Sequence, residues 1–320
     1  MAERIVLVTG ATGYIGSVLV PLLAREYRVR AVDTEHFGNA IADTPNTEFI
    51  KADIQDIDAM LRAMAGVSHV IHLAGIVTDE LVDMNPLLAM KVNLLGTMNV
   101  MRAALRHNGV QRFIYASSSS IYGLQDVVAT IETPPKPMTI YAMTKLLGEQ
   151  IVLDCAKNQA IQPIIVRCAT CCGPAPRMRM DTIVNVFSKQ AYFDHQITVH
   201  GGGQWRTNVH VQDVAELYRS LLQDRVFPTI GNMTSGNHRA IELATMVTQV
   251  AHENAIPCNM IVDTTKVDRR NYLMHSSWTT QKSIREAIED NFRFFASGKV
   301  SNPDDDIWYN TRRMAPLMKG

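Results

Sequence analysis

The chain has 320 residues, 47% of them hydrophobic, so it is long enough for one large α/β domain with an appended lobe or for two smaller domains. Lys plus Arg and Asp plus Glu each number 31, so the formal net charge is zero and the chain lacks the basic field that attracts nucleic acid or an anionic membrane surface. We therefore expect a small-molecule partner, with no nucleic acid and no membrane.

The N-terminus and the cysteines indicate a cytoplasmic protein without a metal site. The first residues, "MAERIVLVTGATG", contain no signal-type apolar segment, and no run of about 18 uncharged apolar residues occurs in the chain. Five cysteines are an odd number for a disulfide framework, and Cys168, Cys171 and Cys172 lack a second Cys or His cluster with zinc spacing. We expect buried thiols and no bound metal.

Apolar strands alternate with helices along the first half of the chain. Residues 4–10, "RIVLVTG", form a β-branched run that ends in glycine, which predicts a strand buried on both faces. Further strands are predicted at 27–33, 48–53, 67–75, 111–120 and 163–170, and helices at 14–26, 90–107 and 141–157. This alternation predicts an α/β protein with a doubly wound parallel sheet of the Rossmann type.

The regular alternation stops after about Thr170. Residues 206–222, "RTNVHVQDVAELYRSLL", are predicted to be helical, and 227–233, "FPTIGNM", to form a strand that returns to the sheet. We expect residues 1–170, joined by 205–233, to form the domain built on the sheet, and 171–204 with 234–320 to form a smaller C-terminal lobe. The polar tail, residues 300–320, is either a docked extension or a loose end.

A glycine-rich turn follows the first predicted strand. In "TGATGYIG", Gly10, Gly13 and Gly16 are three residues apart, and Asp33 ends the second predicted strand. Such glycines allow a tight turn, close approach of the backbone to a pyrophosphate and close helix packing. A carboxylate at the position of Asp33 accepts hydrogen bonds from ribose hydroxyls and repels a 2′-phosphate. The pattern predicts a dinucleotide site that prefers NAD to NADP.

The stretch "IYAMTKLLGEQ" places Tyr141 four residues before Lys145 in a predicted helix. Residues at this spacing share a helix face, so the phenol and the ammonium are expected to meet. At an effective dielectric of about 20, a cation roughly 4 Å from a phenolate stabilises it by about 4 kcal/mol, which moves a tyrosine pKa of roughly 10 towards roughly 7. We expect Tyr141 to exchange a proton with a substrate hydroxyl near neutral pH.

Eight motifs together resemble one protein family. In order, they are "TGATGYIG", "KADIQD", "HLAG", "VNLLGTMNVMRAA", "ASSSSIYG", "YAMTK", "VRCATCCGP" and "VHVQDVA". Over about residues 4–295 the chain is similar to the extended short-chain dehydrogenase/reductase family, specifically to its NAD-dependent nucleotide-sugar epimerases and dehydratases. The resemblance implies NAD as cofactor and a nucleotide sugar as substrate.

The resemblance also implies which residues bind the cofactor. Lys145 is expected to bind the nicotinamide ribose and to lower the pKa of Tyr141, while Asp53 and Ile54 lie beside the adenine. The expected cofactor-binding residues are Gly10, Thr12, Gly13, Tyr14, Ile15, Gly16, Asp33, Asp53, Ile54, Leu73, Ala74, Gly75, Asn93, Tyr141 and Lys145.

A catalytic serine follows from the same resemblance. The family's Ser or Thr stands four residues before the tyrosine of a "YG" pair, and counting back from Tyr122 gives Ser118, with Ser119 as the alternative. The implied role is a hydrogen bond to the sugar oxygen whose proton Tyr141 takes.

Arginines of the second lobe are candidates for the substrate phosphates, because guanidinium groups match phosphate oxygens. Arg206 and either Arg269 or Arg270 match positions where the family places such arginines. Arg177 and Arg179 flank the expected pocket, whereas His72, His200 and His210 are expected to be structural. The expected substrate-binding residues are Ser118, Arg179, Asn185, Arg206 and Arg269.

Two departures from the family pattern bear on the reaction. The acidic pair that dehydratases carry directly after the catalytic Ser or Thr is replaced by Ser119 and Ser120. The family's usual "RYFNVYGP" is replaced by "RCATCCGP", so its aromatic and Asn positions become Cys168, Thr170 and Cys172. The first departure disfavours a dehydratase, and the second predicts an unusual nicotinamide pocket or acceptor site.

The leading hypothesis is an NAD-dependent epimerase that acts on a nucleotide-diphosphate sugar through a transient keto-sugar. In it, hydride passes to bound NAD and back, and Tyr141 is the acid and base. The alternatives are a nucleotide-sugar 4,6-dehydratase or keto-sugar reductase of the same family, and a non-catalytic dinucleotide sensor on the same fold. Helices 90–107 and 141–157 have apolar faces that often pair in this family, which predicts a homodimer.

Overall fold

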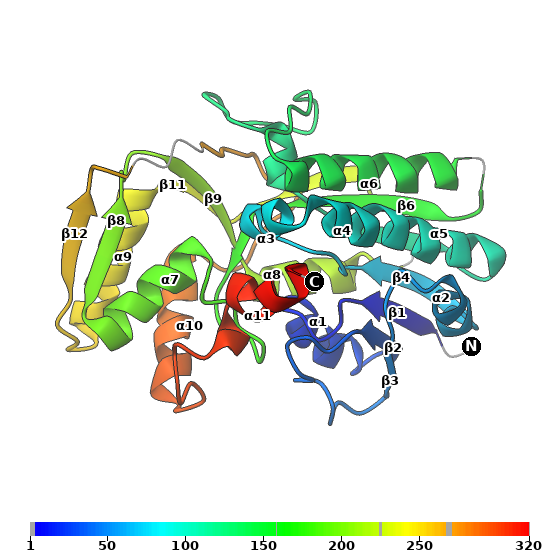
Figure 1. The fold of residues 1–320 in the computed structure, drawn as a ribbon, viewed down its shortest axis with the longest axis horizontal. Coiled ribbons are helices and arrows are strands. Elements are labelled where there is room, and N and C mark those ends of the chain that lie inside the picture. Colours follow the sequence, from blue (N-terminus) through cyan, green and yellow to red (C-terminus); the bar gives the residue numbers. More distant parts are fainter. Residues whose placement is uncertain (1–3, 158, 224–225, 267–270, 320) are drawn as a thin grey trace.

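The computed structural model describes residues 4–157, 159–223, 226–266 and 271–319. A parallel sheet with the strand order β10-β6-β5-β4-β1-β2-β3 forms its centre (Figure 1). The strands are β1 (Ile5–Thr9), β2 (Arg28–Asp33), β3 (Thr47–Lys51), β4 (Val67–His72), β5 (Arg112–Ser118), β6 (Gln162–Cys168) and β10 (Ile230–Met233). The strand order reverses direction between β1 and β4, which confirms the predicted doubly wound α/β fold.

Helices cover both faces of this sheet, because successive residues of a strand point to opposite sides. Val6 and Val8 pack on one side with α1 (Gly16–Leu23) and α8 (Val211–Ser220). Leu7 packs on the other side with α2 (Ile57–Ala63), α5 (Thr97–Arg106) and α6 (Ile140–Ala156). Each fully buried side chain of this type contributes roughly 1.5–3 kcal/mol, so the alternation of apolar residues in β1 fixes the sheet between two helix layers.

The predicted helix at 90–107 is present but is interrupted by a π-helical turn. The segment consists of α4 (Pro86–Met90), a π-helical stretch (Lys91–Gly96) and α5. Gly96 lies against Ile54, since a Cβ atom at Gly96 would come within 2.4 Å of Ile54 Cδ1. The helix therefore sits unusually close to the loop after β3. A short helix, α3 (Asp79–Met84), precedes this segment at the end of β4.

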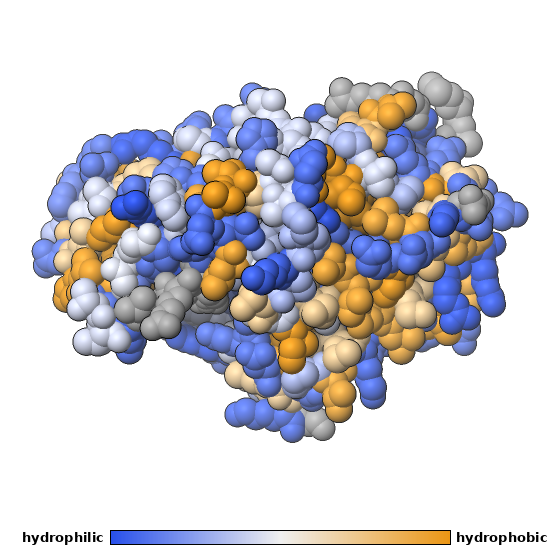
Figure 2. Space-filling view, turned by 90° about the horizontal axis from the view of Figure 1, so that it is seen from above, coloured by the Kyte–Doolittle hydropathy of each residue, from blue (hydrophilic) through white to orange (hydrophobic). Residues whose placement is uncertain are grey.

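Apolar side chains stay exposed on the face formed by α4, α5 and α6. Figure 2 shows this face, with apolar (orange) side chains gathered on the half that lies over these helices. The exposed large apolar residues there are Leu87, Met90, Leu95, Met98, Ile140, Met143 and Leu147. A patch of this kind marks an interaction surface more often than a free surface.

The second lobe has its own core, and one of two small sheets joins it to the domain built on the seven-stranded sheet. One sheet has the order β11-β9-β7, from β11 (Gly236–Arg239), β9 (Trp205–His210) and β7 (Thr170–Cys172), and the other pairs β12 (Asn259–Asp263) with β8 (Gln196–His200). The lobe's apolar core includes side chains of α7 (Ile183–Lys189), α9 (Ala240–Glu253) and α10 (Ile284–Ala296).

The helix predicted at 206–222 is wrong in its first part. Trp205–His210 form strand β9, and helix α8 begins only at Val211, where His210 Nδ1 accepts a hydrogen bond from the amide of Gln212 at 3.1 Å. Strand β9 pairs with β7 and β11, which lie far from it in the sequence. Long-range pairing therefore determines the conformation of this segment, and local periodicity does not.

Candidate active site

A single continuous cavity of about 1330 Å³ lies at the carboxyl edge of the seven-stranded sheet. It is lined by residues that follow β1, β2, β4 and β5, by α6, and by residues of the second lobe near β8 and β9. Open α/β sheets bind ligands in this crevice, where the strand order reverses. The cavity is therefore the candidate site.

The turn between β1 and α1 has the geometry that its glycines predict. Gly10 has a φ of +72°, and a Cβ atom there would lie 2.7 Å from the amide nitrogen of Ala74. At Gly16 a Cβ atom would lie 2.4 Å from the Gly10 carbonyl oxygen. Gly13 differs, because a Cβ atom there would meet the Gly10 oxygen alone, at 3.2 Å, and Gly13 lines the cavity. The turn thus leaves its backbone open to the cavity, which fits the approach of a dinucleotide diphosphate.

Asp33 lies at the end of β2 on the cavity wall, held by two backbone amides. Its Oδ2 accepts a hydrogen bond from Thr12 N at 3.0 Å, and its Oδ1 accepts one from Glu35 N at 2.9 Å. The carboxylate is fixed in place but keeps further lone pairs for ribose hydroxyls. Most of the other expected cofactor residues also line the cavity: Tyr14, Ile15, Asp53, Ile54, Leu73, Ala74 and Gly75.

Three of the expected ligand contacts bond to the protein and do not line the cavity: Thr12, Asn93 and Asn185. Asn93 Oδ1 accepts a hydrogen bond from Ile76 N at 2.8 Å, and Asn185 Oδ1 accepts one from Gly173 N at 3.0 Å. Both amides are buried. They hold the backbone segments that form the cavity walls.

Tyr141, Lys145 and Ser118 meet on the cavity wall. Tyr141 and Lys145 lie one turn apart on α6, whose first turn is capped by Thr139, and Ser118 ends β5. The Ser118 side chain is hydrogen-bonded to the Tyr141 phenol. Ser119, the alternative serine, also lines the cavity. The sequence spacing therefore brings together the residues that it singled out.

The prediction that the pKa of Tyr141 lies near 7 is wrong. Burial raises the pKa of Tyr141 to about 12, opposed by the hydrogen bond with Ser118. The Lys145 ammonium turns to the Ala116 carbonyl at 3.0 Å and lies 5.3 Å from the centroid of the Tyr115 ring. Desolvation dominates, because a buried phenolate loses its hydration. Burial also lowers the pKa of Lys145, to about 8.

A buried polar network, which the sequence analysis did not find, lies beneath these residues. Glu149 follows Lys145 by one helical turn and forms a buried ion pair with Arg167 of β6 at 2.8 Å. Ser117 donates a hydrogen bond to Glu149 at 2.5 Å, and Arg167 donates one to the Tyr122 hydroxyl at 2.9 Å. The network links β5, α6 and β6. The i,i+4 spacing from Lys145 is the signal that identifies Glu149 in the sequence.

Two of the expected substrate arginines also line the cavity. Arg179 Nε donates a hydrogen bond to Asp181 at 2.8 Å, and Arg206 Nη1 donates one to the carbonyl of Trp205 at 2.9 Å. Arg179 is close enough to lower the pKa of Tyr141. Arg269 and its neighbour Arg270 lie outside the described residues. The structure thus places positive charge both beside the phenol and at the β9 end of the cavity.

Arg177 is a buried cation on the cavity wall without a carboxylate partner among the described residues. Its guanidinium lies 3.7 Å from the centroid of the Phe37 ring, and Nη2 donates a hydrogen bond to Asn310 at 2.5 Å. Its Nε has no hydrogen-bond partner in the described part of the chain. Burial lowers the pKa of Arg177 to about 9, and the nearby charge of Arg179 adds to this. An orphaned donor on a buried cation fits an anionic ligand.

Two of the histidines near the cavity are held by protein groups. His72 Nδ1 lies 2.6 Å from the Thr9 hydroxyl and Nε2 lies 3.0 Å from the Thr97 hydroxyl. Burial lowers the pKa of His72 to about 3, so the ring is neutral. His200 pairs with Asp263 at 3.2 Å. These contacts fit structural roles.

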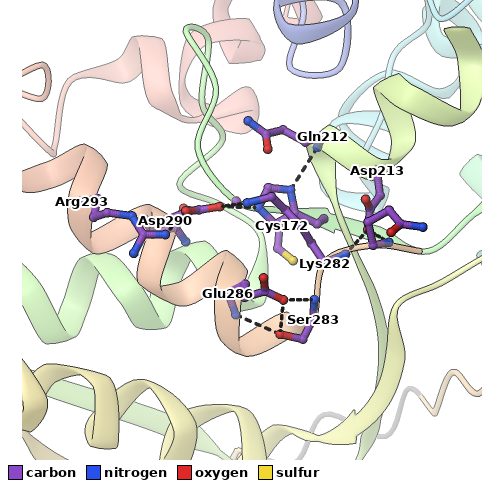
Figure 3. A network of polar contacts seen from close by, with 12 residues as sticks. Cys172, Gln212, Asp213, Lys282, Ser283, Glu286, Asp290 and Arg293 are labelled. Carbon is purple, nitrogen blue, oxygen red and sulfur yellow. Dashed lines mark hydrogen bonds and ion pairs between the residues drawn. The ribbon is translucent and has the colours of Figure 1, made fainter.

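His210 belongs to a polar network that joins β9 and α8 to α10. Figure 3 shows this network, with its members Gln212, Asp213, Lys282 and Asp290 labelled. Because its Nδ1 accepts from the amide of Gln212, its Nε2 carries the proton and donates to Asp290 at 3.1 Å. Lys282 also binds Asp290, at 2.5 Å, and its amide donates to Asp213. The network holds the second lobe against the sheet domain.

All five cysteines are free thiols, and two of them lie at the same cavity. The Sγ atoms of Cys168 and Cys171 are 3.9 Å apart, and both residues line the cavity. The hydrogen bond with Cys171 and burial raise the pKa of Cys168, so that thiol stays protonated. In the described part of the chain, no group of three or more His, Cys, Asp or Glu side chains is arranged to hold a metal.

Comparison with known proteins agrees with this geometry. The sequence model of the "NAD dependent epimerase/dehydratase family" matches residues 6–232. A candidate UDP-glucose 4-epimerase of Methanocaldococcus jannaschii is 29% identical over 217 residues, which cover 66% of this chain and 71% of that protein. UDP-glucuronic acid decarboxylase 4 of Arabidopsis thaliana is 29% identical over 270 residues, 78% of this chain and 58% of that protein.

A solved structure extends the likeness to both lobes. MoeE5 in complex with UDP-glucuronic acid and NAD superposes with a TM-score of 0.81 at 25% identity, covering 92% of this chain and 99% of that one. The fold and the grouping of Ser118, Tyr141 and Lys145 define a Rossmann-fold enzyme of the short-chain dehydrogenase/reductase type. Within that class, the chain belongs to the NAD dependent epimerase/dehydratase family. This confirms the predicted family, enzyme class and cofactor, NAD.

Proposed function

We propose that the protein is an epimerase that converts a nucleotide-diphosphate sugar through a transient keto-sugar. The observation that carries this is the meeting of Ser118, Tyr141 and Lys145 in the same cavity as the glycine-rich turn. The glycine-rich turn, Asp33 and Lys145 would hold NAD, which would supply the hydride acceptor and donor for a sugar carbon. The cycle has no net redox change, which suits a cofactor that stays bound.

In this proposal Tyr141 exchanges a proton with the sugar hydroxyl, and Ser118 bonds the same oxygen. Burial keeps the Tyr141 phenol protonated. Proton transfer from the sugar to Tyr141 therefore depends on the groups that stabilise the phenolate. These groups are the Ser118 hydrogen bond and the Arg179 charge, which both lower the pKa of Tyr141. Lys145 holds the nicotinamide ribose and Asp33 the adenosine ribose.

The two parts of the chain are proposed to bind different ligands. Residues 1–170 with 205–233 bind NAD, and 171–204 with 234–320 bind the sugar nucleotide. Arg206 belongs to the first set of residues but is proposed to bind the substrate diphosphate, because its cationic side chain lines the β9 end of the cavity and β9 pairs with β11 of the second set. Arg269 is proposed as a second phosphate contact, and Asn93 and Asn185 as supports for the walls.

The test combines cofactor analysis with NMR. The purified protein is denatured and any released dinucleotide is identified by mass, and the native protein is incubated with UDP-glucose and with UDP-glucuronic acid. The expected results are near-stoichiometric NAD and conversion of a sugar nucleotide into its epimer. Tyr141→Phe should abolish conversion and keep NAD bound. Conversion by that variant at a substantial rate would refute the role of Tyr141, and a wild type that binds NAD but converts neither sugar would favour a sensor.

A 4,6-dehydratase is the second candidate, and one observation keeps it open. Ser119 and Ser120 supply no acid, but Asp79 at the start of α3 lines the cavity and raises the pKa of Tyr141. A carboxylate beside the phenol is a group that elimination of water requires. NMR of the same incubations distinguishes the two reactions, because a dehydratase yields a 4-keto-6-deoxy sugar. Detection of that product would replace the epimerase proposal.

The proposed assembly is a homodimer formed through the apolar face over α4, α5 and α6 (Figure 2). Leu87 is 74% exposed and Met143 of α6 is 44% exposed, which is costly for a free surface. Within the described residues, no helix has both the length and the apolar character needed to cross a bilayer. We propose a cytoplasmic location. Leu87→Glu with Met143→Glu should yield a monomer in sedimentation, and a wild-type monomer at micromolar concentration would contradict the dimer.

A further inference from the structure

The C-terminal tail returns from the second lobe to the cofactor cleft. After α10 it forms a short 3₁₀ turn (Asp306–Trp308) and helix α11 (Asn310–Met318). We call residues 306–318 the strap. Helix α11 lies beside α3, near the ends of β1 and β4 (Figure 1). The strap lies outside residues 6–232, the segment that the family model matches.

Polar bonds tie α11 to the walls that hold the expected NAD site. Arg313 Nε donates a hydrogen bond to the carbonyl of His36, in the loop after β2, at 2.8 Å. Thr311 Oγ1 donates one to Glu80 of α3 at 3.0 Å. His36 and Glu80 themselves line the cavity, in the loop after β2 and in the helix that follows β4. The strap therefore joins the two sides of the crevice between those strands.

The start of α11 is also fixed to the second lobe. Asn310 N donates a hydrogen bond to Asp181 at 2.9 Å, and the Asn310 side chain accepts the bond from Arg177. Asn310 thus orients the buried cation whose Nε has no partner among the described residues. The anionic group that this cation fits would lie beside the strap.

The other end of α11 is held by apolar packing. Met318 is 2% exposed and packs in a cluster with Ile76, Leu81, Val82 and Ala89, and the half-buried Tyr141 and Met314 pack against this cluster. Five residues of the strap line the same cavity as Gly13 and Asp33: Asn310, Thr311, Met314, Leu317 and Met318. The strap is therefore a wall of the cavity from the cofactor loops to the proposed catalytic phenol.

We propose that the strap retains the cofactor: it closes the cleft over bound NAD, and NAD leaves only when α11 undocks. This rests on the proposed function, since an epimerase that reuses one NAD molecule needs slow release of it. A short terminal helix held by a few polar bonds and one buried methionine opens at lower free energy than the sheet unfolds. The strap thus supplies slow release without sealing the site permanently.

The test uses two neighbouring arginines of α11. Arg313 bonds across the cleft, whereas Arg312 contacts Asp304 and the Tyr309 ring, both within the tail. The full-length protein is loaded with radiolabelled NAD and chased with excess unlabelled NAD, and retained label is followed after gel filtration. The double variant Thr311→Val, Arg313→Ala loses two hydrogen bonds, so it should release NAD about tenfold faster than wild type. Arg312→Ala should release NAD at the wild-type rate.

The thermal midpoint of the NAD-free protein separates a strap from a purely structural helix. If the double variant releases NAD faster while its NAD-free midpoint equals that of Arg312→Ala, the strap is confirmed. If it releases NAD at the wild-type rate, or if Arg312→Ala accelerates release equally, the proposal is overturned. The chase needs no sugar. If the strap variants change NAD retention but the wild type epimerises no sugar, only the proposed function is refuted. If the wild type is an active epimerase but the double variant keeps NAD, only the strap proposal is refuted.

Discussion

Two buried arginines lie near the same cavity in opposite electrostatic situations. Arg167 forms a buried ion pair with Glu149 at 2.8 Å, and the Glu149 carboxylate raises the pKa of Arg167 despite the opposing effect of burial. Arg177 is equally buried, but burial lowers its pKa to about 9, and its Nε has no partner among the described residues.

The difference distinguishes Arg167, whose charge is balanced within the fold, from Arg177, whose charge a bound ligand would balance. A buried charge is stable when protein groups neutralise and bond it, and costly when they do not. The pairing of Arg167 therefore accounts for its burial by the fold alone. Arg177 and Lys145 carry an unbalanced cost, and such groups concentrate where ligands bind. Substitutions should destabilise the protein at Arg167 and Glu149 but impair ligand binding at Arg177 and Lys145.

The largest expected effect is on the paired arginine. Glu149→Leu leaves the Arg167 cation buried and unpaired, which should lower the free energy of unfolding by about 3–5 kcal/mol. Urea unfolding of the NAD-free protein measures this change. The double variant Glu149→Leu, Arg167→Met removes both charges and should recover most of the loss. A double variant as unstable as the single one would show that the Tyr122 and Ser117 bonds, not the charges, dominate the network.

Replacing Lys145 should raise the free energy of unfolding, whereas replacing Glu149 should lower it. Burial lowers its pKa from the ordinary 10.5 to about 8, so below pH 8 the folded protein bears the full cost of the buried ammonium. Lys145→Met should therefore stabilise the NAD-free protein by up to roughly 3 kcal/mol at pH 7, at about 1.4 kcal/mol per pKa unit. The advantage should shrink from pH 8 to 10.5, because wild type loses its proton first in the folded state.

The measurement is urea unfolding of both proteins between pH 7 and pH 10.5, with NMR assays of sugar conversion alongside. The variant should be inactive at every pH. A variant that is less stable than wild type at pH 7 would show that the bond from Lys145 to the Ala116 carbonyl outweighs the cost of burying the charge.

The same contrast explains what the sequence could predict. The glycine turn, Asp33 and the positions of Tyr141 and Lys145 on α6 depend on neighbours within one strand or one helical turn, and these residues line the cavity. The Lys145 ammonium, however, bonds to the Ala116 carbonyl, which no local pattern indicates. The charge states were not predictable, because the pKa of Tyr141 depends on burial by distant segments. Strand β9 was mistaken for helix for the same reason, since its partners are β7 and β11.

The tail shows the limit of local prediction most clearly. Its composition is polar, and nothing near it in sequence indicates that Asn310 reaches Arg177 or that Arg313 reaches His36. Those partners are 133 and 277 residues away along the chain. A docked tail and a loose one have the same local pattern, so the alternatives left open by the sequence are decided only by the folded cavity.

The smallest expected effect, and the most specific, is at Arg177. Arg177→Met removes a costly buried cation, so the stability of the NAD-free protein should not fall. NAD binding should weaken by about 1.5–3 kcal/mol, roughly tenfold to a hundredfold in Kd, the usual contribution of a hydrogen bond to a charged group. Arg177→Lys keeps the charge but not the planar fork, so its Kd should lie between the two. Calorimetric titration with NAD measures all three proteins. Unchanged NAD affinity together with a destabilised Arg177→Met protein would place Arg177 in the same structural class as Arg167, because its bond to Asn310 and contact with Phe37 would then account for its burial.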